Sequence, residues 1–291
     1  MDTLKIGLCC GTLLNAGLIE LIETAGRHGF PTITVRPAAF ASALEQGYTE
    51  KALRRRLTDA GVQVTMVDAL TEGLPGLSTL DISDPKLRAL LPSDVFFPPD
   101  QDTCLHAAEA LEASFINVTH FGRKPVPLEE MTGAIGAVCR RARARGLQVA
   151  LEFVPGTGLP DLVSADVVAR SCGEPNCRIT LDPWHLDRSG GSVEDVVRLL
   201  PGSLAGVQLC DRIPEQPGDV YVPMSGRIMP GEGQLPLVEL VRAALANSPA
   251  ISIEVELFND ELRRLSSDEI AARVASGTKA WCSTFSGQLS Y

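Results

Sequence analysis

The stretch CRITLDPWHLDRSGG, residues 177–191, joins a strand-like run to a dense group of ionisable side chains. Apolar and β-branched residues lead directly into Asp182, and His185, Asp187 and Arg188 follow before two glycines. Such a run is typical of a buried strand that ends in a turn. A single acidic residue there would be an ordinary helix cap, whereas the same feature at other strand ends would indicate one wall of an active site.

The strand-and-turn pattern recurs along the chain in alternation with amphipathic helices. Strands are expected at residues 3–10, 32–37, 62–68, 115–120, 147–153, 178–182, 204–211 and 251–257. Helices are expected near residues 15–29, 49–60, 102–113, 127–146, 164–171, 193–200, 235–246 and 266–281. Alternation of this kind implies parallel strands, and eight units close a (β/α)8 TIM barrel. We therefore predict one α/β domain, a single TIM barrel, over residues 1–291.

An open, doubly wound sheet is the alternative arrangement of the same elements. It would be favoured by a glycine-rich phosphate loop after the first strand, but CCGTLLNAG at 9–17 lacks that fingerprint. The connection over residues 69–101 is long and contains several prolines and glycines. It is interpreted either as a lid over the pocket or as an irregular insertion with a short helix.

Composition argues against several classes of protein. The 291-residue chain has a formal net charge of -10 and 5% aromatic residues, which is unfavourable for binding nucleic acid. No run of about 18 apolar residues predicts a membrane span, and the N-terminus lacks a secretory pattern. We expect a cytoplasmic protein that binds a small-molecule substrate, with no nucleic-acid or membrane partner; a homo-oligomer is compatible with the sequence.

The cysteines are spaced irregularly and fall mostly in apolar segments, as expected of buried free thiols in a reducing compartment. Cys172 and Cys177 flank the turn GEPN, but no second Cys/His pair accompanies them. A zinc site at this pair is therefore not expected.

Oxygen-bearing side chains lie at the ends of four consecutive predicted strands, which is where a TIM barrel carries its active site. Neighbouring carboxylates repel one another, and their joint burial is costly unless a cation compensates them. A donor set made only of oxygen atoms suits a hard divalent ion. We predict a site for Mg²⁺ or Mn²⁺ formed by Glu152, Asp182, Gln208 and Glu256.

Some of these assignments have alternatives. Gln208 also fits a polar strand residue that only makes a hydrogen bond. Glu254 shares a strand face with Glu256 because side chains alternate with a period of two. Glu256 is preferred as the ligand since it lies nearer the end of the strand, with Glu254 one layer deeper.

Other polar residues near predicted strand ends are candidates for lining the pocket. His120 and Asp68 fit either the pocket or a structural position. Arg36 and Arg212 are candidates for holding a hydroxyl, carboxylate or phosphate group of the substrate. A structural salt bridge is the competing role for Arg212.

Several segments together resemble the xylose isomerase-like (β/α)8 barrels, also called the sugar phosphate isomerase/epimerase superfamily. The resemblance covers nearly the whole chain and is carried by LEFVPGTG, ITLDPWHLDRSGG, GVQLCDR, RIMPGEGQLPL and ISIEVELFND. It implies a divalent metal bound by Glu, Asp, His and Glu at four strand ends. Glu152, Asp182 and Glu256 match that pattern, whereas Gln208 stands where the family has histidine.

The resemblance also implies roles for two further residues. A histidine matching His185 contacts substrate or assists proton transfer, and an arginine matching Arg227 contacts substrate. With glutamine at position 208, the chain resembles the branch of the family that contains bacterial 3-dehydroshikimate dehydratases, where a glutamine takes the same place. PGEGQLPL, residues 230–237, fits a tight turn better than a phosphate loop, because Glu232 would repel an anion.

The predicted chemistry is the removal of a proton next to a carbonyl group, with Glu152 and Glu256 as acid and base and His185 assisting. An isomerase or epimerase acting on a sugar-like polyhydroxylated carbonyl compound is favoured, and a 3-dehydroshikimate dehydratase-like lyase is the alternative. A non-catalytic binding barrel is a further class. Four histidines and the acidic net charge argue against a nuclease that cuts DNA at abasic sites.

Overall fold

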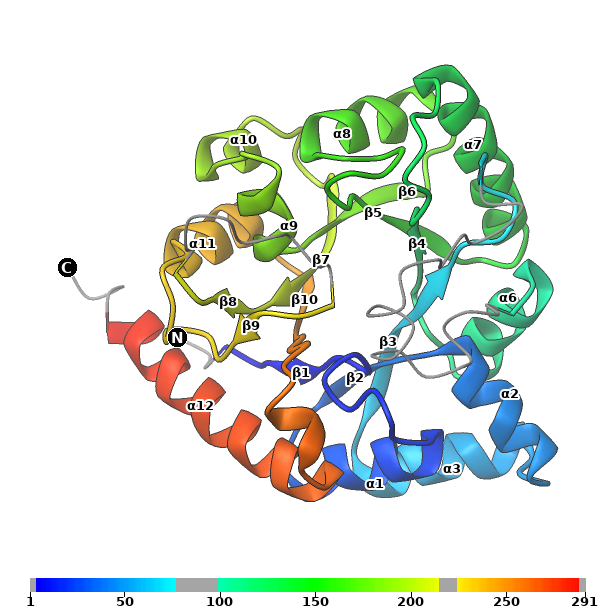
Figure 1. Cartoon of the computed structure of the whole chain (residues 1–291). Helices are drawn as coiled ribbons and strands as arrows, with labels where there is room; N and C mark the ends of the chain where they lie inside the picture. The colour runs from blue at the N-terminus through cyan, green and yellow to red at the C-terminus, as the bar shows by residue number, and fades with distance from the viewer. Residues whose placement is uncertain (1–3, 77–98, 215–223, 288–291) are drawn as a thin grey trace.

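Eight parallel strands close into a barrel in the order β1-β10-β7-β6-β5-β4-β3-β2 (Figure 1). The computed structural model describes residues 4–76, 99–214 and 224–287. The barrel strands are β1 (Gly7–Leu8), β2 (Thr32–Val35), β3 (Gln63–Leu70), β4 (Phe115–Thr119), β5 (Gln148–Glu152), β6 (Cys177–Leu181), β7 (Leu204–Leu209) and β10 (Ser252–Val255). The predicted (β/α)8 TIM barrel is confirmed.

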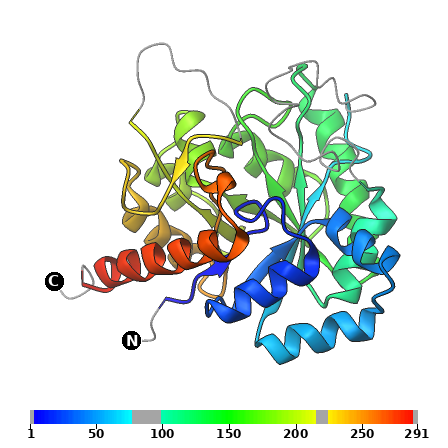
Figure 2. The ribbon, with the colours of Figure 1, turned by 60° about the horizontal axis from the view of Figure 1, so that its bottom comes forward.

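Helices surround the barrel on its outer face. They are α1 (Leu18–Arg27), α2 (Pro37–Glu45), α3 (Glu50–Ala60), α6 (Gln101–Ala110), α7 (Leu128–Ala144), α8 (Leu162–Ser171), α9 (Pro183–Arg188), α10 (Val193–Val197), α11 (Leu237–Asn247) and α12 (Ser267–Gly287), with a short 3₁₀ turn η1 (Leu262–Arg264). Figure 2 shows α12 running alongside α1, so the last helix of the chain packs against the first. None of the helices in the described ranges is long and apolar enough to cross a membrane.

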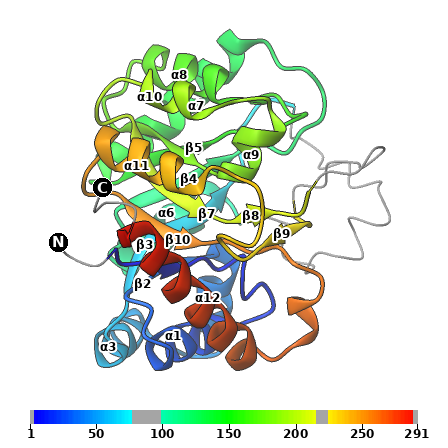
Figure 3. The ribbon, with the colours of Figure 1, turned by 90° about the vertical axis from the view of Figure 1, so that its left-hand side faces the viewer.

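The structure contains elements that the sequence pattern did not predict. α2 and α9 both begin at a proline, which suits the first helical position because its missing N–H needs no partner there. β8 (Asp211–Arg212) pairs antiparallel with β9 (Arg227–Ile228) beyond the end of β7, beside α9 (Figure 3). The predicted strand 3–10 is shorter and covers only Gly7–Leu8. Most of the 69–101 connection, residues 77–98, lies outside the described residues. The predicted alternatives for it, a lid or an irregular insertion, therefore stay predictions.

The interior of the barrel changes character along its axis. Met66, Ala150 and Ala205 form a small apolar cluster separate from the main core, which fills the space between strands and helices. Two residues further along β3 and β5, on the same face as Met66 and Ala150, lie Asp68 and Glu152. The C-terminal ends of the strands therefore enclose polar side chains above an apolar floor.

Candidate active site

Four neighbouring strands carry the predicted oxygen donors. Glu152 is the last residue of β5, Asp182 follows β6 directly, Gln208 lies near the end of β7, and Glu256 follows β10 directly. In the closed barrel these strands stand side by side in the order β10-β7-β6-β5. The four side chains are buried, each at most 6% exposed. The fold brings the four residues to one end of the barrel, and their binding of a metal stays a prediction.

Asp182 serves both as a helix cap and as part of this cluster. Its Oδ1 accepts hydrogen bonds from the backbone N–H groups of Trp184 at 2.7 Å and His185 at 3.3 Å, so it caps α9. Its Oδ2 accepts from the Nη2 of Arg227. α9 in turn directs the Nε2 of His185 to within 3.3 Å of Glu152 Oε1 and 3.4 Å of Asp182 Oδ2. LDPWH is therefore a capped turn that also forms one wall of the cluster.

Glu152 is held by two side chains of β4 that the sequence analysis did not single out. Its Oε2 accepts from Asn117 Nδ2 at 2.6 Å and from Thr119 Oγ1 at 2.8 Å. Asn117 also donates to Asp68 at 2.8 Å, so it joins two carboxylates. The alternation of polar residues at 117 and 119 in FINVTH was the available signal, because it places both on one face of the strand.

Glu256 and Gln208 form the other side of the cluster. Glu256 Oε1 accepts from the thiol of Cys9 at 3.0 Å and from Gln208 Nε2 at 3.3 Å. Its Oε2 lies 3.4 Å from Arg227 Nη2. The Oε1 of Gln208 is buried and has no hydrogen-bond partner among the residues that the structure describes. A buried carbonyl oxygen without a partner is costly, which is consistent with a bound cation or ligand at that position.

Glu254 occupies a different environment from Glu256. It is the register partner of Gln208 on the neighbouring strand β7. It lies two residues before Glu256 along the chain, one layer deeper in the barrel than Glu256. Its carboxylate accepts from Thr65 at 2.8 Å, Ser252 at 3.0 Å and Thr32 at 3.2 Å. These hydroxyl groups satisfy it, which supports Glu256 as the member of the pair that faces the pocket.

Arg227, the first residue of β9, is the central cation of the cluster. Its side chain is 1% exposed, its Nη2 contacts both Asp182 and Glu256, and its guanidinium lies 4.8 Å from the ring centroid of Phe258. Burial works against its charge, but the two carboxylates outweigh burial and hold the pKa of Arg227 well above its usual value.

The carboxylates respond differently to their shared burial. Burial raises the pKa of Glu256 to about 8; Arg227 opposes that rise, whereas Glu152 and Asp182 add to it. For Asp182 burial also acts upward, but Arg227 and then His185 outweigh it, so its pKa is lowered. Burial raises the pKa of Asp68 well above its usual value. With a pKa of about 8, Glu256 therefore holds a proton near neutral pH when no metal is bound.

The stability of the metal-free protein should therefore fall as pH rises. Because the pKa of Glu256 is about 8 when folded and near 4.5 when unfolded, the folded state binds more protons between these values. This stabilisation is complete below pH 4.5 and is lost as pH rises through 8. We expect the melting temperature to decrease across this window, measured by circular dichroism. Glu256→Gln should flatten the decrease; an unchanged pH profile would contradict the assignment.

The pocket above the cluster is lined by residues from several strand ends. Glu152, His185, Gln208, Arg227 and Glu256 all contribute to its wall. The remaining lining residues include Arg36, which caps α2, and the apolar or small side chains of Cys10, Leu14, Pro37, Phe121, Met224 and Phe258. Arg36 therefore lines the same pocket, and its binding of a substrate anion stays a prediction.

His120 does not line this pocket; it connects two loops instead. Its Nδ1 accepts from the backbone N–H of Gly158 at 3.1 Å. Its Nε2 is therefore protonated in the neutral ring and donates to the carbonyl of Pro75 at 2.9 Å. Both ring nitrogens are used by backbone groups, so the geometry gives no support to the predicted substrate contact.

Arg212 likewise lies outside the pocket lining and makes a structural contact. Its Nε is 2.6 Å from Oδ2 of Asp187, so the pair links β8 to α9. The competing role considered for Arg212, a structural salt bridge, is the one that its geometry favours over substrate binding.

Asp211 organises the loop that begins with PGEG at residue 230. This role was not predicted from the sequence. Its carboxylate, 1% exposed, accepts from the backbone N–H groups of Arg212 at 2.9 Å, Leu235 at 3.0 Å, Gly233 at 3.0 Å and Gly231 at 3.1 Å. A Cβ on Gly233 would lie 2.2 Å from Asp211 Oδ1, which explains that glycine. The loop is thus wrapped around a carboxylate and leaves no room for phosphate.

Asp211→Ala should destabilise the protein by at least about 2 kcal/mol. It leaves several backbone donors without an acceptor, and each buried one costs about 1–3 kcal/mol. Urea unfolding monitored by circular dichroism measures the change. Glu232→Ala, an exposed acidic residue of the same loop, is the matched control and should change stability by less than about 0.5 kcal/mol. Equal effects of the two variants would contradict the anchoring role.

The fold agrees with a comparison of the sequence with protein families. The profile of the xylose isomerase-like TIM barrel family matches residues 22–280. The chain belongs to this family. Comparison with curated proteins gives no match.

Several solved structures align with nearly the whole chain. The IolI protein with a bound zinc atom superposes with a TM-score of 0.78 at 17% identity, covering 97% of this chain and 99% of that one. The probable 3-DHS dehydratase AsbF from Bacillus anthracis gives 0.70 at 18% identity, covering 95% and 99%. A D-psicose 3-epimerase gives 0.67 at 15% identity, covering 95% and 98%. These likenesses show the fold.

Proposed function

We propose that this xylose isomerase-like barrel is a divalent-metal-dependent isomerase or epimerase of a polyhydroxylated carbonyl compound. The observation that carries the proposal is that four adjacent strands bring Glu152, Asp182, Gln208 and Glu256 to one end of the barrel, where Glu152, Gln208 and Glu256 line a pocket. Structural similarity to a D-psicose 3-epimerase and to the IolI protein with a bound zinc atom supports it.

The residues at the site fit a divalent cation. Asp182 and Glu256 contact the guanidinium of Arg227, and Asn117 joins two further carboxyl groups, those of Asp68 and Glu152, to the same cluster. Their negative charge exceeds that of the arginine, and the unpartnered Oε1 of Gln208 adds a neutral oxygen. We assign the metal to Glu152, Asp182, Gln208 and Glu256. These oxygen donors favour Mg²⁺ or Mn²⁺.

Zinc is the alternative metal, and a different donor set would select it. Oxygen atoms of Glu152 and Asp182 and a ring nitrogen of His185 lie within 4.8 Å of one another. Imidazole suits Zn²⁺ well. Metal analysis of protein purified without chelators, compared with the His185→Gln variant, distinguishes the two sets, because only the nitrogen-containing set loses its metal on this substitution.

A bound divalent cation would polarise the substrate carbonyl and so make the neighbouring C–H group more acidic. The chain itself supplies the groups that move the proton. Glu152 keeps Oε1 directed toward His185 while Asn117 and Thr119 hold Oε2, so one oxygen is positioned and the other is available. Glu256 reaches the pocket from β10, on the other side of the cluster. Two carboxyl groups that approach from different strands could remove a proton from one face of the substrate and return a proton to the other face.

The remaining pocket residues would bind and orient the substrate. His185 presents Nε2 beside Glu152, where it can orient a hydroxyl group or pass a proton. Arg36 lies at the pocket wall and suits an anionic or hydroxyl substituent. The side chains of Phe121 and Phe258 give the pocket an apolar wall that excludes water from the reacting atoms.

Exchange of solvent deuterium into a panel of ketoses tests the proposed isomerase or epimerase. With Mn²⁺ or Mg²⁺ present, NMR should detect deuterium next to the carbonyl of at least one sugar. Removal of the metal with a chelator should abolish the exchange, and re-addition should restore it. Absence of exchange with every ketose would contradict the isomerase and epimerase assignment.

A dehydratase is the second candidate, favoured by Gln208. The resemblance carried by the sequence implies a histidine at this position in the family and a glutamine in the branch of 3-dehydroshikimate dehydratases. The probable 3-DHS dehydratase AsbF is among the similar structures. The same proton removal would then be followed by loss of water. Incubation with 3-dehydroshikimate and Mn²⁺ tests it through the ultraviolet absorption of protocatechuate. Absorption at this band favours the lyase, and its absence removes that candidate.

A further inference from the structure

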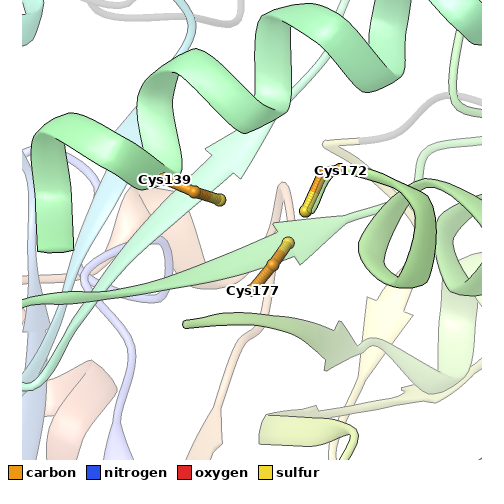
Figure 4. Close-up of side chains that lie close together, drawn as sticks. All are labelled: Cys139, Cys172 and Cys177. Carbon is orange, nitrogen blue, oxygen red and sulfur yellow. The ribbon is translucent and has the colours of Figure 1, made fainter. Parts of the chain in front are cut away.

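Three cysteines from three separate elements meet outside the barrel (Figure 4). Cys139 lies on α7, Cys172 caps the C-terminus of α8, and Cys177 opens β6. Their sulfur atoms lie within 4.8 Å of one another, and all three are free thiols. The sequence showed only the pair that flanks the GEPN turn, because Cys139 is more than thirty residues away along the chain.

The thiol cluster is distinct from the candidate active site. Cys177 begins β6, whereas Asp182 follows the opposite end of the same strand. At about 3.3 Å per residue the strand separates them by roughly 15 Å. None of the three cysteines lines the pocket above the carboxylates. The cluster therefore has to be explained without reference to the proposed isomerase chemistry.

The surrounding backbone brings the three sulfurs together. Gly136 allows α7 to approach α8 closely, since a Cβ there would lie 2.8 Å from the carbonyl oxygen of Cys172. Asn176 donates its side-chain N–H groups to the carbonyls of Cys139 at 2.9 Å and Leu147 at 3.0 Å, which ties the turn to α7 and β5. The Oδ1 of Asn176 is buried and lacks a hydrogen-bond partner among the described residues.

The thiols share their protons unequally. Hydrogen bonds from Cys139 and then Cys177 to the sulfur of Cys172 lower the pKa of Cys172 to about 3. The same contact with Cys172 raises the pKa of Cys139 to about 12. A thiolate is the form that binds metals, so a cation held by these three sulfurs would displace their protons.

We propose that Cys139, Cys172 and Cys177 form a second metal site, which binds a thiophilic divalent cation such as Zn²⁺ through three thiolates. Binding displaces the protons that the sulfurs share and leaves a complex with one net negative charge. Zinc prefers four ligands in a tetrahedron, and Cys177, the most exposed of the three, leaves a side open for a water molecule as the fourth. The cation would tie α7, α8 and β6 together, which is a structural role.

Titration with Cd²⁺ tests the site, because cadmium thiolates absorb in the ultraviolet and oxygen ligands do not. Metal-free, reduced protein should show saturable absorption that ends at one Cd²⁺ for each chain. Cys172→Ser and Cys177→Ser should each weaken Cd²⁺ binding by at least about tenfold. Loss of a hydrogen-bond partner of a metal ligand already costs about that much, and loss of the ligand itself should cost more. Zn²⁺ should compete for the site. It should also raise the melting temperature of a Glu152→Gln/Glu256→Gln double variant, but not that of the same double variant carrying Cys177→Ser.

Matched variants locate the absorbing thiolates. Cys104→Ser alters a buried cysteine on α6 outside the cluster and should leave the titration unchanged. Cys10→Ser tests the other candidate group, in which Cys9, Cys10 and Asp68 lie within 4.8 Å. Absorption lost in Cys10→Ser and retained in Cys172→Ser would overturn the proposal. A Glu152→Gln/Glu256→Gln double variant should keep the absorption, which separates this site from the proposed active site.

Two further outcomes would also overturn the proposal. One is the absence of saturable absorption in the wild-type protein. The other is a loss of two free thiols in air-oxidised protein without any metal affinity in the reduced form, which would assign two of the three cysteines to a disulfide. If Cys172→Ser fails to fold, Cys177→Ala at the edge of the cluster gives the same comparison.

Discussion

Glu256→Gln is expected to lower metal-dependent deuterium exchange into the substrate by about 10²–10⁴-fold, the usual contribution of a positioned acid or base. The substitution keeps the size of the side chain and its contacts with Cys9 and Gln208, but it removes the group that gains and loses the proton. It also removes one charged metal ligand. Exchange rates by NMR and metal content by elemental analysis measure the two effects separately. Glu152→Gln should behave in the same way.

Glu254→Gln is the matched control for this experiment. Glu254 lies two residues earlier on β10, is equally buried, and faces the same side of the strand. Its carboxylate is occupied by Thr32, Thr65 and Ser252, so its change to an amide should affect stability rather than exchange. Loss of exchange in Glu254→Gln with retention in Glu256→Gln would reverse the assignment of the two residues.

The sequence was sufficient for the fold and for the position of the donors. Eight alternating strands and helices predicted the barrel, and a carboxylate at a parallel strand end must lie at the same rim as its counterparts. Glu152, Asp182, Gln208 and Glu256 follow from this rule because each belongs to the strand itself or to the residue after it. Local periodicity is enough for such positions, since no knowledge of distant contacts is needed.

Residues whose roles depend on distant contacts could not be predicted. His120 follows β4 as a ligand might, yet Gly158 and Pro75 take both of its ring nitrogens. Asp211 also follows a strand, but the backbone of a loop twenty residues later encloses it. Cys139, the third member of the thiol cluster, could not be predicted for the same reason, because only packing brings α7 beside Cys172 and Cys177. Position along a strand fixes which end of the barrel a side chain occupies, and only packing determines what it touches.

Arg227→Met should destabilise the metal-free protein at pH 8 by about 3–5 kcal/mol, the cost of breaking a buried ion pair. Arg227 lies at the start of β9, and its Nη2 is shared by Asp182 and Glu256. Methionine fills much of the same space but leaves the two carboxylates buried against each other. Urea unfolding followed by circular dichroism measures the loss. Protonation of Glu256 at low pH should recover part of it, as should addition of the metal.

Arg212→Met is the control for the loss of an arginine near the same strands. Among the described residues Arg212 forms its ion pair with Asp187, and both side chains retain some exposure, 15% and 29%, so screening by solvent limits the cost to about 1 kcal/mol. The double variant Arg227→Met/Asp182→Asn should be more stable than Arg227→Met, because removal of one uncompensated charge relieves the repulsion. Equal losses for Arg227→Met and Arg212→Met would mean that the carboxylates are not held by Arg227. A cluster stable without its arginine would then need another source of positive charge even before a metal binds.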